Sequence, residues 1–261
     1  MRLVFGILRT LELPNSGILF LKVNYRSICN FATMITDELD AQSFTFLEET
    51  PFLDHSHPNI QAYVAEFREL TDPQEQATQL YLKVRDGFLY DPYHLDLRPE
   101  ALVSSAIIGN SRAWCVEKAI VCCSGLRALG IPARLGFGIV KNHVGVDKLV
   151  SYLRKDEIVF HGFVEVLLNG GWTKCTPAFD RRICRINQVQ PLEWDGTSDS
   201  LFQAFRGEEK YMEYIHFYGS FADVPISLMH SEMQAHYPHL FETPIDTTAF
   251  SFRFDSTLVV E

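Results

Sequence analysis

Residues 114–134 read WCVEKAIVCCSGLRALGIPAR, and this stretch decides the fold prediction. Hydrophobic residues recur at a spacing of three and four from Val116 to Leu126, which predicts a helix over residues 111–130. Gly130 and Pro132 end it, because glycine commonly follows the last helical residue and proline cannot continue a helix. The N-terminal end of this helix therefore carries the pair 114–115, tryptophan and cysteine.

Two segments that follow the helix are rich in β-branched and aromatic residues. The segments 133–140 and 157–168 are predicted to be strands, and the segment 141–156 between them is predicted to be a polar loop. The dipeptide 169–170, Asn-Gly, favours a two-residue type I′ turn that joins the second strand to a third strand from Gly171.

This turn also predicts the pairing of the two strands that it joins. If Leu168 faces Gly171, then His161 lies opposite Ala178, with Thr176 and Asp180 as its diagonal neighbours on the same face. Regular pairing should end near position 177, where proline has no N–H to donate.

Helical patterns come first in the chain and strands follow. Amphipathic helices are predicted over residues 59–70 and again from Pro73 to Phe88, whereas the aromatic segment beyond residue 184 shows no regular pattern. This order predicts an α+β fold in which the cysteine-bearing central helix packs on an antiparallel sheet.

The composition of the chain excludes some classes of function. The chain has 261 residues, 47% of them hydrophobic, and a formal net charge of -10, so we expect a globular protein and neither nucleic acid nor a membrane surface as its partner. The six cysteines form no CxxC pair and predict reduced thiols in a cytoplasmic protein.

The N-terminal segment is not predicted to be part of the domain. Residues 1–33 carry no secretion signal and form an extension of doubtful status, either a translated upstream stretch or a genuine extra element. Met34 opens an ordinary cytoplasmic start, and residues 34–261 are predicted to form one domain.

Cys115 is the candidate nucleophile. Unpaired N–H groups and the dipole at a helix start favour a thiolate, the reactive form of cysteine; the alternative is a buried thiol that only packs. A catalytic cysteine also needs a base, which His161 can provide, and a third group to hold the imidazole tautomer. Asp180 is preferred for that role because it can carry charge, whereas Thr176 offers only a hydroxyl.

Four motifs in order carry a family resemblance: Cys-Val-Glu-Lys-Ala at 115–119, Leu-Gly-Ile-Pro-Ala-Arg at 129–134, His-Gly-Phe-Val-Glu-Val at 161–166, and Gly-Trp at 171–172 with Thr-Pro-Ala-Phe-Asp at 176–180. With these motifs, residues 80–225 resemble the transglutaminase-like superfamily. The resemblance implies a papain-like core in which a helix presents the cysteine and strands present the histidine and an Asp or Asn. It also implies acyl transfer from an amide through a thioester.

The sequence departs from the family pattern at two positions. Thr176 stands where the family has Asp before proline, and Ala113 stands where it often has Gly. The functional prediction is a cysteine peptidase, amidase or transferase that acts on a peptide, protein or small amide and needs no cofactor or metal. The alternative is a non-catalytic module with the same fold.

Other residues near these motifs leave alternatives open. Trp114 could form a wall of the site or simply pack at the helix start. His143 ranks second to His161 as the base, because no carboxylate has a predictable place beside it. A zinc site made of Cys115, His161 and a carboxylate is the third and weakest interpretation.

Overall fold

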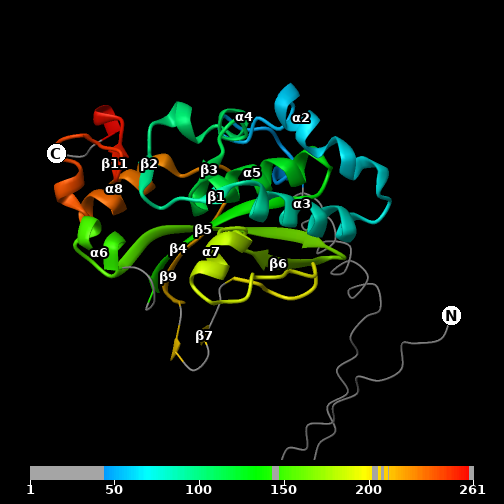
Figure 1. Cartoon of the computed structure of the whole chain (residues 1–261). Coiled ribbons are helices and arrows are strands. Elements are labelled where there is room, and N and C mark those ends of the chain that lie inside the picture. The colour runs from blue at the N-terminus through cyan, green and yellow to red at the C-terminus, as the bar shows by residue number, and fades with distance from the viewer. Residues whose placement is uncertain (1–43, 143–146, 202–204, 207–208, 211, 259–261) are drawn as a thin grey trace, which may run out of the picture. The chain divides into compact units, whose positions relative to one another are not determined.

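A computed structural model describes residues 44–142, 147–201, 205–206, 209–210 and 212–258. The expected boundary at residues 33 and 34 lies outside these ranges. Helices α2 to α5 gather on one face of an antiparallel sheet (Figure 1). The described residues therefore have the α+β architecture that the sequence predicts, and their helices are α2 (Pro58–Val64), α3 (Pro73–Gly87), α4 (Ser104–Ile107), α5 (Cys115–Ala128), α6 (Asp147–Leu153), α7 (Arg181–Ile186) and α8 (Ile226–His236).

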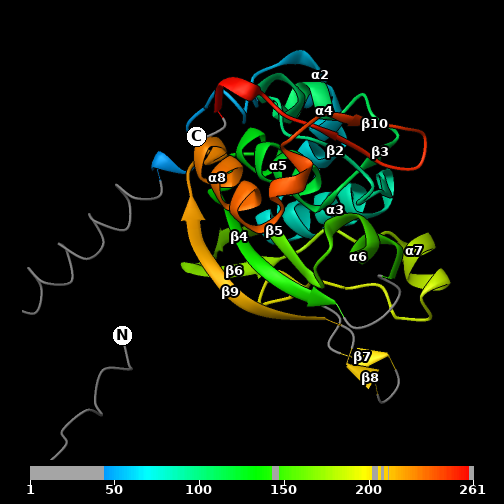
Figure 2. The same cartoon turned by 90° about the vertical axis from the view of Figure 1, so that its left-hand side faces the viewer.

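The strands form one main sheet and three small ones. In the main sheet the order is β6-β5-β4-β9, with every neighbouring pair antiparallel (Figure 2). These four strands are β4 (Ala133–Asn142), β5 (Glu157–Leu168), β6 (Gly171–Cys175) and β9 (Met212–Phe221). The small sheets pair β1 (Leu89–Tyr90) with β3 (Arg112–Ala113), β2 (His94–Asp96) with β11 (Ser251–Arg253) and β10 (Ile245–Asp246), and β7 (Phe205–Arg206) with β8 (Glu209–Lys210).

Four short 3-10 helices complete the described elements: η1 (Ala65–Glu69), η2 (Pro99–Leu102), η3 (Pro238–Leu240) and η4 (Ser256–Leu258). The single helix expected over residues 59–70 is thus split into α2 and η1, as commonly happens where the last turn of a helix tightens. The helix expected from Pro73 is confirmed, and the Asp72 side chain caps it by accepting from Gln74 N.

Helix α5 is the centre of the core. It contacts α2, α3 and α4 on one side and β4 and β5 on the other. Nearly every residue of α5 is buried, so its apolar surface runs all round rather than along one stripe. The helix begins at Cys115, four residues later than predicted, because Arg112 and Ala113 pair as β3 with β1.

The hairpin of β5 and β6 forms as the sequence predicts. Asn169 and Gly170 both have positive φ, at 52° and 79°, as a type I′ turn requires. The register pairs Leu168 with Gly171 and continues as far as the pair Val164 and Cys175. Beyond Cys175 the chain leaves β5, and Thr176 N donates to Ser200 O.

Two sequence predictions of irregular structure are wrong. The segment 141–156 was expected to be a loop, but it contains α6, whose Leu149 and Leu153 lie one turn apart on a buried face. The segment beyond residue 184 contains β9, which pairs with β4, and α8, which contacts β5. Short apolar faces in charged or aromatic segments give weak periodicity, so these elements depend on tertiary contacts that one sequence does not display.

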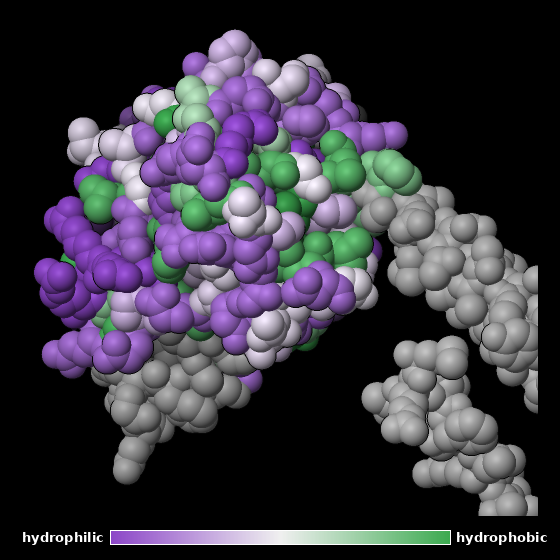
Figure 3. Space-filling model, turned by 90° about the vertical axis from the view of Figure 1, so that its right-hand side faces the viewer, coloured by the Kyte–Doolittle hydropathy of each residue, from purple (hydrophilic) through white to green (hydrophobic). Residues whose placement is uncertain are grey.

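One face of the molecule is mainly polar. Hydrophilic residues predominate on the face shown in Figure 3. None of the helices in the described ranges is both long enough and apolar enough to cross a bilayer.

Gly162 on β5 allows α5 to approach the sheet. A Cβ at this position would lie 3.0 Å from Val116 Cα and 3.2 Å from Cys115 O, both backbone atoms that have little freedom to move. Replacing Gly162 with alanine should therefore lower the free energy of unfolding by about 1–3 kcal/mol, the usual cost of overpacking. Urea denaturation would measure the change.

Gly171 provides the matched control for this substitution. It lies on β6, and a Cβ there would meet only Leu168 O, at 3.9 Å. Gly171→Ala should leave stability nearly unchanged, and equal stability of the two variants would contradict the role assigned to Gly162.

Candidate active site

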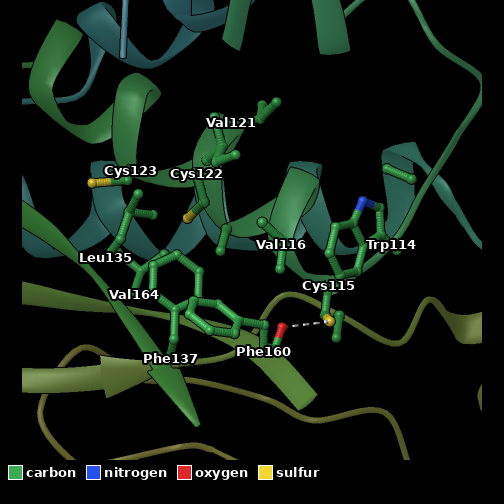
Figure 4. Close-up of a cluster of buried hydrophobic side chains, with 14 of the residues drawn as sticks. Trp114, Cys115, Val116, Val121, Cys122, Cys123, Leu135, Phe137, Phe160 and Val164 are labelled. Carbon is green, nitrogen blue, oxygen red and sulfur yellow. Dashed lines mark hydrogen bonds between the residues drawn. The ribbon is translucent and has the colours of Figure 1, made fainter. Parts of the chain in front are cut away.

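Cys115 is the first residue of α5 and is only 2% exposed. Its Sγ lies 4.0 Å from the Phe160 carbonyl oxygen, to which the thiol donates (Figure 4). Burial raises the pKa of the thiol to about 11, although the backbone N–H groups of Gly162, Val116 and Cys115 act in the opposite direction. In this structure the nucleophile candidate is therefore a neutral thiol rather than the thiolate expected from its place at a helix start.

A β-bulge in β5 brings the Phe160 carbonyl to the thiol. The pairing of β4 with β5 shifts register between Gly138 and Val140, and Phe160 has a φ of 61°. A bulky residue in this left-handed region is rare, and such strain concentrates at functional sites. Tyr237 holds the same stretch of β5, since its hydroxyl accepts from Val159 N at 2.9 Å and donates to Glu157 O at 2.6 Å.

His161 follows the bulge and is only 1% exposed. Its Nδ1 forms a hydrogen bond of 2.9 Å with the Tyr214 hydroxyl, whereas its Nε2 has no partner among the described residues. Burial lowers the pKa of the imidazole to about 4. The ring is therefore neutral at ordinary pH and leaves one nitrogen without a partner.

Tyr214 on β9 is a site residue that the sequence analysis missed. Its ring covers Gly138, where a Cβ would lie 2.8 Å from Tyr214 Cδ1. Burial raises the pKa of its hydroxyl, while the nearby Thr176 side chain lowers it, although Thr176 Oγ1 has no partner within ordinary hydrogen-bond geometry. Tyr214 thus stands between His161 and Thr176, at the place where the family resemblance implies a carboxylate.

Cys115 and His161 are neighbours through the backbone of β5. The thiol lies against Phe160 O, and the N–H of Gly162 also faces the sulfur, so the two residues that flank His161 in sequence both interact with Cys115. Among the described residues no hydrogen bond joins the thiol to the imidazole. The structure brings the two candidates together but does not show them paired.

Asp180 makes no hydrogen bond with His161 among the described residues, so the expected contact is not seen. Its Oδ1 caps α7 by accepting from Arg182 N and Ile183 N at 2.8 and 3.1 Å, and its Oδ2 accepts from Tyr90 N at 2.6 Å. The argument from strand register fails at this residue because the ladder ends at Cys175. The carboxylate instead fixes the start of a short helix.

Lys118 is a second residue that the sequence analysis did not single out. It is fully buried and donates to three backbone carbonyls, those of Arg85, Phe88 and Ala178, at 2.7, 3.1 and 2.7 Å. Burial lowers its pKa to about 7, and the nearby Asp180 carboxylate acts in the opposite direction. Lys118 ties α5 to the turn that follows Thr176.

The other candidates of the sequence analysis have different outcomes. Trp114 lines the pocket beside Cys115, and its indole nitrogen lies at the end of the ring away from the sulfur (Figure 4). Ala113 lies in β3, opposite Tyr90. His143 lies outside the described residues.

The structure also bears on the zinc interpretation. In the described part of the chain, no group of three or more His, Cys, Asp and Glu side chains is placed to hold a metal ion.

Residues 61–177 match the family model of the transglutaminase-like superfamily. This part of the chain is similar to the transglutaminase-like superfamily. This match runs from within α2 to just beyond β6 and includes both Cys115 and His161, whereas β9 with Tyr214, α8 and Tyr237 lie beyond it. The chain has no significant match among curated proteins or solved structures.

The role of Asp180 as a helix cap leads to a prediction. Asp180→Ala should destabilise the protein by about 1–3 kcal/mol through loss of the α7 cap and of the bond from Tyr90 N, whereas Asp180→Asn should keep the cap and lose only the bond from Tyr90 N. Thermal denaturation would measure both variants. If either variant lost thiol-dependent activity as completely as His161→Ala does, Asp180 would belong to the site after all.

Proposed function

We propose that this transglutaminase-like domain is a thiol-dependent acyl-transfer enzyme in which Cys115 is the nucleophile and His161 is the base. Members of the superfamily are typically cysteine-dependent enzymes. The observation that carries the proposal is the position of the Cys115 sulfur, which lies against the backbone on both sides of His161. The imidazole nitrogen without a partner supports the same role, since a base needs a free nitrogen.

The pKa values favour general-base catalysis from a neutral pair. With the thiol pKa near 11 and the imidazole pKa near 4, proton transfer accompanies attack instead of preceding it. The Cys115 sulfur leaves the Phe160 carbonyl and attacks the substrate carbonyl, and the thiol proton passes to His161 Nε2. The leaving group takes that proton, and water then hydrolyses the thioester.

Tyr214 sets the tautomer that this mechanism needs. A base-competent imidazole carries its proton on Nδ1, which requires the Tyr214 oxygen to accept from it. Tyr214 can accept if its own proton points away from His161, on the side of Thr176. The neutral Tyr214 hydroxyl then takes the place of the carboxylate in the family pattern, and it stabilises an imidazolium less than a negative charge would.

The proposed substrates are peptides, proteins or small amides, and hydrolysis is the proposed outcome because no feature of the chain selects an amine acceptor. A papain-like arrangement of helix and strands is part of the proposal. The five cysteines in the described residues are free, which fits the proposed location in the reducing cytoplasm.

A second candidate is a binding module that keeps the fold without turnover. Two observations favour it: both candidate residues are almost completely buried, and no hydrogen bond joins the thiol to the imidazole. In that case Cys115 would be a packed thiol with ordinary chemistry.

Acylation of the full-length protein by p-nitrophenyl butyrate distinguishes the two candidates. An enzyme should release nitrophenol and carry the butyryl group on Cys115 in peptide mass spectrometry, and Cys115→Ala and His161→Ala should each lose this reaction while staying folded. Since the folded pKa of His161 is depressed to about 4, the rate should stay level from pH 8 to about 5 and fall as pH drops through 4. An acylation rate that is unchanged in His161→Ala would support the binding module.

The tautomer argument predicts the effect of removing one hydroxyl. Tyr214→Phe should slow acylation by about 10- to 100-fold, a part of the usual contribution of a positioned base. Tyr218→Phe is the matched control, because Tyr218 lies on the same strand and its hydroxyl instead donates to Glu232 at 2.8 Å. Equal rates in the two variants would remove Tyr214 from the mechanism.

A further inference from the structure

The pocket beside Cys115 is apolar. Its lining includes Leu95 of β2, Trp114, Leu149 and Leu153 of α6, Ile158 of β5 and Met233 of α8. Among the described residues, no Asp, Glu, Lys, Arg or His side chain lines it. Mostly apolar side chains therefore surround the Cys115 thiol on the side that faces this pocket.

Charged side chains nearby are directed elsewhere. Successive residues of a strand face opposite sides, so Leu95 of β2 lines the Cys115 pocket while its neighbours His94 and Asp96 line a separate, larger groove. Tyr237 also lines the Cys115 pocket, but its hydroxyl is already bonded to the backbone of β5. The described side chains that line the pocket therefore bring no charge to the thiol.

The pocket is also small. Its volume is about 20 Å³, room for about one water molecule. Leu149 and Leu153 of α6 and Met233 of α8 form one part of its lining, here called the cover, and each of these side chains is almost completely buried. Methionine adapts its shape easily, so a short chain can enter by displacing the Met233 side chain, whereas a long one must displace both helices.

We propose that the pocket selects short, uncharged aliphatic acyl groups for transfer to Cys115; this rests on the proposed function. A carboxylate on the acyl chain would lose its hydration without gaining a partner in the pocket. Each methylene that enters gains about fourfold in rate through burial of apolar surface, until the chain meets the cover. The first step forms the thioester S–C bond, breaks the bond to the leaving group and passes the thiol proton to His161.

Four p-nitrophenyl esters test this selectivity on the full-length protein: acetate, butyrate, octanoate and hemisuccinate. Each acylation rate of Cys115 is divided by the rate of the same ester with free glutathione, which cancels intrinsic reactivity. Butyrate should exceed acetate by about fifteenfold, the effect of two methylenes. Butyrate should also exceed octanoate and the hemisuccinate, which matches butyrate in carbon number but carries a charge, by at least as much.

Variants of the cover test the location of the pocket. Leu149→Ala and Leu153→Ala should each shift the preference from butyrate toward octanoate by about tenfold. Leu80→Ala is the matched control, since Leu80 is fully buried in α3 against Gly125 and does not line the pocket. The control should keep the wild-type ranking even if all three variants lose stability.

The outcomes distinguish a failure of the pocket proposal from a failure of the enzyme proposal on which it rests. If Cys115 is acylated in a His161-dependent way but the four normalised rates are equal, or if the cover variants keep the wild-type ranking, the pocket proposal is overturned and the enzyme proposal stands. If no ester acylates Cys115, both are overturned.

Discussion

The close approach of α5 to β5 at Gly162 is the constraint on which the rest of the structure depends. A Cβ on residue 162 would lie 3.0 Å from Val116 Cα in the first turn of α5. Glycine, which has no Cβ, therefore allows this approach. This contact places Cys115 at the edge of β5, next to the backbone of Phe160 and Gly162. The same contact buries the thiol, so proximity to the histidine and loss of solvation have one cause.

Burial and the lack of a charged partner together explain why the candidate pair is neutral. Desolvation disfavours both thiolate and imidazolium, and a carboxylate beside His161 would oppose that effect. Here Nδ1 instead meets the Tyr214 hydroxyl. The thiol pKa near 11 and the imidazole pKa near 4 therefore belong to one arrangement, which suits proton transfer during attack better than a preformed ion pair.

Short sequence patterns predicted the helix and the hairpin that carry Cys115 and His161. They did not predict the side chain that contacts His161. The Asn169–Gly170 turn was enough to predict the hairpin register, because a two-residue turn leaves one pairing. The same register suggested Asp180 as the partner of His161, but Asp180 caps α7 instead. Tyr214 lies 53 residues from His161 in an aromatic segment without clear periodicity, so no spacing in the sequence points to it.

The segments that shape the site most specifically lie beyond the family match. Tyr214, Met233 and Tyr237 all follow residue 177, and they respectively hold the imidazole, cover the pocket and fix the bulge of β5. The matched core supplies a cysteine and a histidine, which are common to many chemistries. Because the later segments decide which imidazole nitrogen is free and what can reach the thiol, differences in specificity within this architecture should arise from the C-terminal part of the chain.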